Sequence, residues 1–387
     1  MMKRIFMIVL DSLGIGAAPD AAEFGDENTN TLESIVKSEK FYCPNMKRLG
    51  LFNIEGVNCG TPEDQPVGNY GRLREKSGGK DTIIGHWELA GIISEKAMPL
   101  FPDGFPKEFT DEFEKRTGRK FICNKPYSGT EVIKEYGEEH MRTGDLILYT
   151  SADSVCQIAA NESIVPVEQL YEYCETAREI LSGDMAVGRV IARPFVGTSS
   201  NSFCRTSNRH DFALSPPAPT MLDLLCGHGK DVIALGKIFD IFNGKGITET
   251  YKTAGNTDGM EKLRMISERD FSGLCFLNLV DFDMLYGHRR DVDGYAQALT
   301  EFDGFLTGFM ETMRDDDLLI ISADHGCDPA YMKTTDHTRE DVPVLMYNRK
   351  NTKGRSYGTC EGFTCAANTI CHQLGVESRF YGKTLDL

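Results

Sequence analysis

Three short apolar segments, far apart in the sequence, are each followed at once by acidic side chains. The segments Arg4–Leu10, Leu274–Val280 and Asp317–Ser322 have the composition typical of strands that are covered on both faces of a sheet. In open α/β sheets the ligand crevice lies outside the carboxyl ends of the strands, so we expect the polar residues there to meet at one site. Those residues are Asp11, Asp281, Asp283, Asp324 and His325.

The same pattern predicts the fold class. An amphipathic helix is expected over Tyr295–Met313, between the second and third of these strands. Alternation of strands and helices predicts an α/β core with a mainly parallel sheet flanked by helices.

The middle of the chain is expected to form a smaller inserted α+β cap domain at 99–215, between two parts of the core domain at 1–98 and 216–387. Proline-rich stretches mark both of its edges, at Pro99–Pro106 and Ser215–Pro219, and are candidate hinges. Within it we expect helices at Pro106–Thr117 and Val167–Leu181 and strands at Leu146–Ser151 and Arg189–Arg193.

Charge and composition exclude several classes of partner. The chain has 387 residues and a net charge of −16, which disfavours nucleic acid. Its longest clean apolar run, Ile5–Leu10, is far shorter than the roughly 20 residues of a membrane-spanning helix. That run is also shorter than the core of a secretory signal, so we interpret the N-terminus as mature protein. The 12 cysteines include no Cys-x-x-Cys pair, which favours reduced thiols in the cytoplasm.

Six side chains near the expected strand ends could hold two metal ions. Mixed carboxylate and imidazole ligands suit divalent zinc, manganese or iron, and two ions about 3.5–4 Å apart can clamp a phosphoryl group in transfer. Each piece also has a structural alternative: a capped strand end at Asp324, a surface pairing of Asp283 with His288, and a buried structural role for His337. The candidate ligands are Asp11, Asp283, His288, Asp324, His325 and His337.

The segment Gly78–Glu88 contains a candidate nucleophile. Thr82 could carry a phosphoryl group if a metal lowered the pKa of its hydroxyl. Alternatively, Asp81 or Thr82 is the N-cap of a helix; the two roles are compatible, because a helix N-terminus also favours phosphate. A dinucleotide-binding loop at Gly14-x-Gly16 is disfavoured, since Pro19 replaces the third glycine of that motif.

Taken together, these segments resemble the phosphopentomutase family of the alkaline phosphatase superfamily over nearly the whole chain. The segments that carry the resemblance are Val9–Gly16, Gly79–Thr82 with Gly85–Glu88, Gly188–Phe195, Asn208–Asp211, Asp281–Arg289, Ala323–Gly326 and Thr335–Glu340.

The resemblance implies a set of functional residues. One metal would be held by Asp283, His288 and His337, and the other by Asp11, Asp324 and His325, with Thr82 beside it as the phosphorylated residue. The implied ions are manganese. Residues implied to bind the pentose or its distal phosphate are Asp153, Arg189, Ile191, Lys237, Arg193, Arg205 and Arg209.

The implied reaction is the interconversion of ribose 1-phosphate and ribose 5-phosphate, and of the 2-deoxyribose forms, through phosphothreonine and a pentose bisphosphate. A hexose or pentose bisphosphate would be the activator, and the cap would exclude water during transfer. The sequence does not decide the oligomeric state, and a monomer is one option. Ile83 and Ile84 depart from the smaller residues frequent in the family, and Cys327 replaces a polar residue.

Other functions compete with this one. A metal-dependent phosphomonoesterase or a phosphoglycerate mutase of the same superfamily would share the metals but not the pentose-type residues Asp153, Arg189 and Lys237. A sulfatase is disfavoured because the chain has no Cys-x-Pro-x-Arg segment. A non-catalytic metal-binding protein would not need Thr82.

Overall fold

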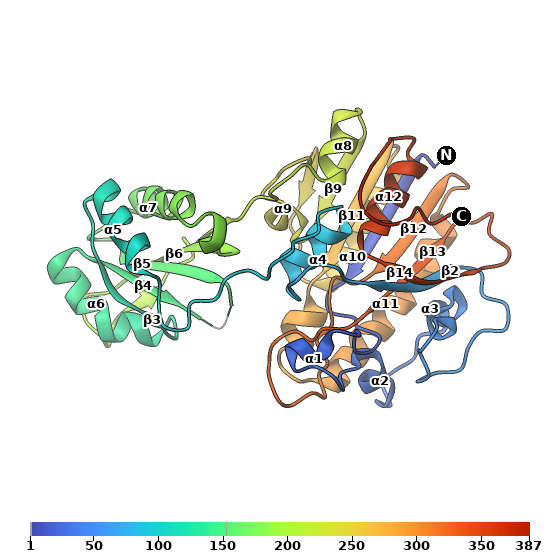
Figure 1. Cartoon of the computed structure of the whole chain (residues 1–387), viewed down its shortest axis with the longest axis horizontal. Coiled ribbons are helices and arrows are strands. Elements are labelled where there is room, and N and C mark those ends of the chain that lie inside the picture. Colours follow the sequence, from blue (N-terminus) through green and yellow to red (C-terminus); the bar gives the residue numbers. More distant parts are fainter. Residues whose placement is uncertain (1, 152) are drawn as a thin grey trace. The chain divides into compact units, whose positions relative to one another are not determined.

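The computed structural model describes residues 2–151 and 153–387, which form two compact units (Figure 1). Unit 1 consists of Met1–Ala97 and Pro216–Leu387, and unit 2 is Met98–Ser215. No described helix combines the length and the apolar composition needed to cross a bilayer.

Unit 1 is built on an eight-stranded mixed sheet in the order β10-β9-β11-β1-β12-β13-β2-β14. The five strands from β10 to β12 are parallel, whereas β13 runs antiparallel to both of its neighbours. The strands are β1 (Arg4–Leu10), β2 (Asn69–Arg74), β9 (Asp231–Leu235), β10 (Glu249–Tyr251), β11 (Gly273–Leu279), β12 (Asp317–Ser322), β13 (Val342–Tyr347) and β14 (Ser356–Glu361).

Every residue of β1, β11 and β12 is buried, because helices cover both faces of this sheet. In one group of helices α2, α3 and α10 each contact α11, and in another α4 and α8 each contact α12 (Figure 1). The helices are α1 (Ala21–Phe24), α2 (Thr31–Val36), α3 (Pro44–Leu49), α4 (Thr82–Leu89), α8 (Met221–Gly227), α9 (Ile238–Ile241), α10 (Asn256–Glu268), α11 (Val292–Thr312) and α12 (Thr364–Gln373), with short turns η1 (Leu51–Asn53) and η3 (Phe282–Gly287). The predicted α/β core with a flanked, mainly parallel sheet is confirmed.

A buried ion pair sets the register of the central strands. Arg4 at the start of β1 lies opposite Asp317 at the start of β12, and both side chains are fully buried. The guanidinium donates from Nε to Oδ1 at 2.8 Å and from Nη2 to Oδ2 at 2.6 Å. Because the register is fixed at this end, the opposite ends of β1 and β12 finish side by side, with Val9 opposite Ser322.

Unit 2 is a six-stranded sheet in which β6 pairs with β5, β7 and β8. Helices α5 and α7 pack on one face through an apolar cluster that includes Leu148, Ile158 and Val190. Helix α6 packs on the other face. The elements are β3 (Phe121–Pro126), β4 (Leu146–Thr150), β5 (Val155–Asn161), β6 (Arg189–Val196), β7 (Cys204–Arg205), β8 (His210–Ala213), α5 (Lys107–Thr117), α6 (Glu131–Thr143), α7 (Val167–Ile180) and the short turn η2 (Gly183–Met185).

The loop after β1 is no dinucleotide-binding turn. A Cβ on Gly14 would lie 2.2 Å from Oε2 of the buried Glu340, and the next helix begins only at Ala21. Gly14 therefore makes room for a carboxylate, which is unsuited to a pyrophosphate cradle.

Candidate metal centre

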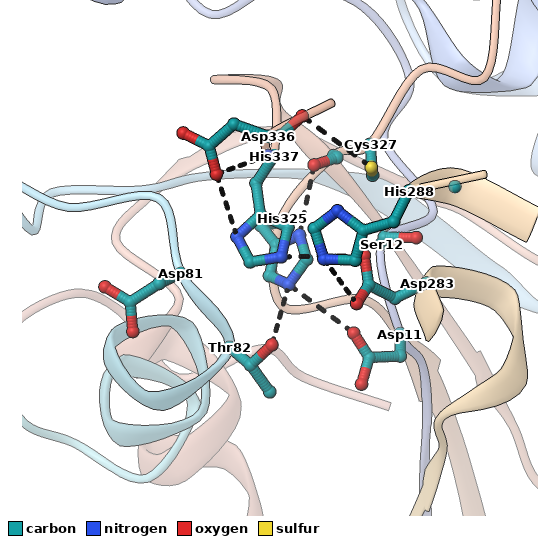
Figure 2. Close-up of polar contacts among 12 residues, drawn as sticks. Asp11, Ser12, Asp81, Thr82, Asp283, His288, His325, Cys327, Asp336 and His337 are labelled. Atoms are coloured by element: carbon teal, nitrogen blue, oxygen red, sulfur yellow. Dashed lines mark hydrogen bonds and ion pairs between the residues drawn. The ribbon is translucent and has the colours of Figure 1, made fainter. Parts of the chain in front are cut away.

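Polar residues lie just beyond the carboxyl ends of β1, β11 and β12, as the sequence predicted. Asp11 follows β1, Asp324 and His325 follow β12, and Asp283 lies in the π-helical turn η3 after β11. These strands are neighbours in the sheet, so their ends converge on one place. Figure 2 shows the side chains of Asp11, Asp283 and His325 pointing toward one another.

The backbone directly after β1 orients one of the side chains of this site. Ser12 has a φ of +79°, which is uncommon outside glycine. In this conformation the Ser12 N–H donates to Asp324 Oδ1 at 3.1 Å, and its hydroxyl lies 3.2 Å from the hydroxyl of Tyr295. The strained residue therefore orients one carboxylate, a feature typical of functional sites.

One group of candidate ligands is formed by Asp11, Asp324 and His325, which are all buried. His325 Nε2 lies 3.4 Å from Asp11 Oδ1 and 3.3 Å from Asp324 Oδ2. The three were expected together from the resemblance, and the structure brings them together.

Asp283 is the centre of the other groups. Its carboxylate lies 3.2 Å from His288 Nε2 and 3.6 Å from His337 Nε2, and the two imidazole rings are 4.7 Å apart. Nδ1 of His288 lies 2.6 Å from the carbonyl oxygen of Thr335, which leaves Nε2 free for a cation. The pairing of Asp283 with His288 is therefore present, with the carboxylate buried and the imidazole partly exposed.

The groups overlap, since Asp283 and His325 each belong to two of them. Besides the expected residues, Cys327 Sγ lies within ligand distance of Asp283 and His288. The complete groups are Asp11, Asp324 and His325; Asp283, His325 and His337; and Asp283, His288 and Cys327.

The donor atoms fit metal ions. Four buried atoms among these residues have no hydrogen-bond partner: Asp11 Oδ1, Asp283 Oδ1, Asp324 Oδ2 and His337 Nε2. Leaving buried polar atoms unpaired is costly, and carboxylate and imidazole lone pairs are the ligands of divalent transition metals.

The buried carboxylates of the site have pKa values shifted in opposite directions. Burial and the neighbouring Asp324 raise the pKa of Asp11. Burial also opposes ionisation of Asp283, but His337 and His288 outweigh it and hold the pKa of Asp283 well below its usual value. The hydrogen bond to Asp283 raises the pKa of His288, although burial opposes this. A bound divalent cation would take over this role of charge compensation.

Thr82 is the first residue of α4, and the N-terminus of this helix points at the site. Asp81 is the N-cap: its Oδ1 accepts from the N–H groups of Ile83 and Ile84 at 3.0 and 3.1 Å. The Thr82 hydroxyl lies 3.1 Å from His325 Nε2 (Figure 2). The predicted N-cap is therefore confirmed at Asp81, and it places Thr82 beside a candidate ligand.

Two buried residues near the site were not predicted from the sequence. His86 lies one turn after Thr82, with its Nδ1 3.0 Å from Asp324 Oδ2 and 2.9 Å from the Thr82 carbonyl oxygen. Asn278 Nδ2 lies 3.0 Å from His86 Nε2 and donates to Asp11 Oδ2 at 2.9 Å. Together they contact both carboxylates of the group formed by Asp11, Asp324 and His325, a position typical of residues behind metal ligands.

The residues expected to bind substrate are divided between the units. Lys237 follows β9 in unit 1, at the start of α9. The others lie in unit 2: Asp153 in the turn before β5, Arg189, Ile191 and Arg193 on β6, Arg205 on β7 and Arg209 just before β8.

Known proteins identify the family. A family model described as the metalloenzyme superfamily matches residues 3–378. A phosphopentomutase of Lachnoclostridium phytofermentans is 55% identical over 384 residues, which cover 99% of this chain and 98% of that protein. The chain belongs to the phosphopentomutase family.

Other relatives agree with this assignment. Phosphopentomutases of Acetivibrio thermocellus and Clostridioides difficile are each 51% identical and cover 99% of this chain and 98% of their own lengths. A phosphoglycerate mutase of Leishmania mexicana is 11% identical with a TM-score of 0.50, covering 99% of this chain and 97% of its own, which shows the shared fold alone. As a phosphopentomutase family member, the chain is an isomerase that acts by phosphotransfer, and its superfamily and ligand groups support divalent metal binding.

Proposed function

We propose that this enzyme interconverts ribose 1-phosphate and ribose 5-phosphate, and the 2-deoxyribose forms, through a phosphothreonine at Thr82 and a pentose bisphosphate. The observation that carries the proposal is the Thr82 hydroxyl, 3.1 Å from His325 Nε2, at the end of a helix that faces the unpaired ligand atoms. The names of the relatives support the proposed isomerisation. The position of the Thr82 hydroxyl supports the choice of Thr82 as the nucleophile.

Two divalent ions, which the resemblance implies to be manganese, are proposed to complete the site. Asp11, Asp324 and His325 would hold one ion, and Asp283, His288 and His337 the other. Bound there, they would stabilise charge on the transferring phosphoryl oxygens and lower the pKa of the Thr82 hydroxyl.

The chain's own residues then account for the transfer. The phosphoryl group leaves Thr82 Oγ1 for a hydroxyl of the pentose monophosphate, so one P–O bond breaks as another forms and a bisphosphate results. Reversal with the other phosphate of the bisphosphate returns the group to Thr82. In the first turn of α4, Asp81 accepts from the N–H groups of Ile83 and Ile84 through its side chain and from that of Gly85 through its carbonyl oxygen, so the N–H of Thr82 is the one that could donate to the phosphate.

Substrate recognition is proposed to involve Asp153, Arg189, Ile191 and Lys237 for the pentose, with unit 2, taken as the cap domain 99–215, keeping water from the bisphosphate. A hexose or pentose bisphosphate would restore phosphothreonine after hydrolysis. We place the reaction in the cytoplasm, in nucleoside salvage.

One reaction mixture tests the proposal. The enzyme is incubated with ribose 1-phosphate, manganese and a trace of hexose bisphosphate, and ribose 5-phosphate and free phosphate are followed together. Fast isomerisation with little phosphate release is expected. Phosphate release without isomerisation would instead make the enzyme a phosphomonoesterase and would contradict the proposed mutase.

A further inference from the structure

A buried cysteine lies beside the candidate metal ligands of unit 1. Cys327 is fully buried, and its N–H donates at 3.2 Å to the carbonyl oxygen of Ser12, in the loop after β1. This bond anchors the chain two residues after the candidate ligand His325. The side chain of Cys327 therefore has a defined place next to the site.

The sulfur lies within reach of two candidate ligands. The Sγ atom of Cys327, a carboxylate oxygen of Asp283 and a ring nitrogen of His288 all lie within 4.8 Å of one another (Figure 2). A Zn–S bond is about 2.3 Å long and a Zn–N bond about 2.1 Å, so two such donors of one ion lie at most about 4.4 Å apart. Small side-chain movements would therefore bring all three donors onto one ion.

His288 belongs to a group of three donors only through this sulfur. Among residues 2–151 and 153–387, the one group of candidate ligands that includes His288 contains Asp283 and Cys327. His337 instead forms a group with Asp283 and His325. The three donors that the fold brings together around His288 therefore include a sulfur.

Asp283 offers this group an unpaired oxygen. Its side chain is 8% exposed, and its Oδ1 has no hydrogen-bond partner. Its Oδ2 lies 3.2 Å from Nε2 of His288, and that ring is oriented by the carbonyl oxygen of Thr335, 2.6 Å from Nδ1. A buried carboxylate oxygen without a partner is costly. This observation does not depend on the cysteine, and it also indicates a bound cation.

Both polar contacts that the described residues make with the sulfur are long. Arg290 donates from Nη1 to Sγ at 3.5 Å, and Sγ donates to the carbonyl oxygen of Asp336 at 3.8 Å. A Cβ on Gly287 would lie 2.9 Å from Sγ. Gly287 directly precedes His288, so the absence of a side chain there lets the sulfur approach this histidine.

A sulfur donor changes which ions a site favours. Thiolate is a soft ligand that selects zinc, whereas carboxylate and water suit manganese. When a cysteine binds a metal ion, the thiol proton passes to solvent and the sulfur binds as thiolate. One cysteine among carboxylate and imidazole groups would therefore alter metal selectivity without removing any other ligand.

We propose that Cys327 is a sulfur ligand of the ion held by Asp283 and His288, and that it shifts the selectivity of this site from manganese toward zinc and cobalt. The inference rests on the metal centre of the proposed function but not on the proposed mutase reaction. The ligands of the other ion include no sulfur, so the selectivity of that ion is unaffected; they are Asp11, Asp324 and His325.

Cobalt titration of the metal-free full chain tests the sulfur ligand. The wild type should develop the visible bands of bound cobalt together with an intense near-ultraviolet band from charge transfer between sulfur and cobalt. Cys327→Ser, which exchanges the sulfur for an oxygen, should keep the visible bands and lose the near-ultraviolet one. Its affinity for zinc relative to manganese, measured by competition with a chromogenic chelator, should fall at least about tenfold.

Cys226→Ser is the matched control, because Cys226 is an exposed cysteine of the same unit on α8. It should retain both the near-ultraviolet band and the wild-type selectivity. Circular dichroism checks that each variant is folded. X-ray absorption at the zinc edge of the zinc-loaded wild type needs no variant, and a sulfur neighbour at about 2.3 Å is expected.

The possible outcomes separate the sulfur ligand from the rest of the proposed function. Visible cobalt bands without a near-ultraviolet band in the wild type, or an unchanged near-ultraviolet band in Cys327→Ser, would discard the sulfur ligand and retain the metal centre. Absence of any cobalt binding would overturn both. A sulfur band in an enzyme that fails to isomerise ribose 1-phosphate would retain the ligand and discard the proposed mutase reaction.

Discussion

The proposed chemistry of the site depends on the hydroxyl of Thr82. Thr82→Ala removes the proposed phosphoryl acceptor, so isomerisation should fall by a factor on the order of 10⁴ or more. Metal content should stay unchanged, because the carboxylate and imidazole groups remain. Coupled assay of ribose 5-phosphate formation and elemental analysis of the purified protein measure the two quantities. Thr82→Ser, which keeps a hydroxyl, should retain measurable activity; full activity in the alanine variant would remove Thr82 from the mechanism.

His86 lies behind the candidate metal ligands. His86 touches Asp324 and, through Asn278, is linked to Asp11, so His86→Ala leaves both carboxylates less constrained. We expect metal affinity to fall by about 10- to 100-fold. Competition with a chromogenic chelator measures this, and His228→Ala, an exposed histidine at the end of α8, is the control. Unchanged affinity in His86→Ala would show that the ligands hold their places without it.

At this scale the sequence predicted the residues that lie at strand ends but not those behind them. Asp11, Asp324 and His325 could be found because strand, acid and histidine are adjacent in the sequence. The link from His86 to Asn278 joins residues 192 positions apart, and each has an ordinary structural explanation when taken alone. Only the packing of α4 against β11 reveals their contact.

Helix α4 packs closely against the backbone of Asp324, just after β12. A Cβ on Gly85 would lie 2.0 Å from the backbone oxygen of Asp324 and 2.8 Å from its carbonyl carbon. Backbone cannot yield as a flexible side chain can, so Gly85→Ala should push α4 away from Asp324. It should lower both the free energy of unfolding and the isomerisation rate, even though alanine favours helix over glycine.

Gly304→Ala in α11 is the matched control for this prediction. A Cβ at Gly304 meets no atom within 4 Å, so the helix propensity of alanine should act alone and stabilise the protein by up to about 1 kcal/mol. Urea denaturation of both variants measures the difference. A Gly85→Ala protein as stable and active as the wild type would contradict tight packing of α4 on Asp324.

Element boundaries show where sequence patterns lose information. The apolar spacing predicted a helix from Tyr295, whereas α11 begins at Val292, because the side chain of Asp291 caps it by accepting from the Gly294 N–H at 2.9 Å. The strands β1 and β12 occupy their predicted ranges, since fully buried strands are marked by composition along their whole length.

The described residues form two units, each with its own buried apolar residues, and the candidate metal ligands among them all lie in unit 1. We therefore expect two thermal transitions, of which only one responds to metal. A ligand at 100 times its dissociation constant stabilises the native state by about 2.7 kcal/mol. For a unit of this size, that corresponds to a rise in Tm of at least about 5 °C.

Differential scanning calorimetry with manganese and with a chelator checks this prediction. The transition of unit 2 should stay in place, because its apolar core contains none of the candidate ligands. A single transition that moves as a whole with manganese would show that the units unfold together, and the separate cores would then not be independent in stability.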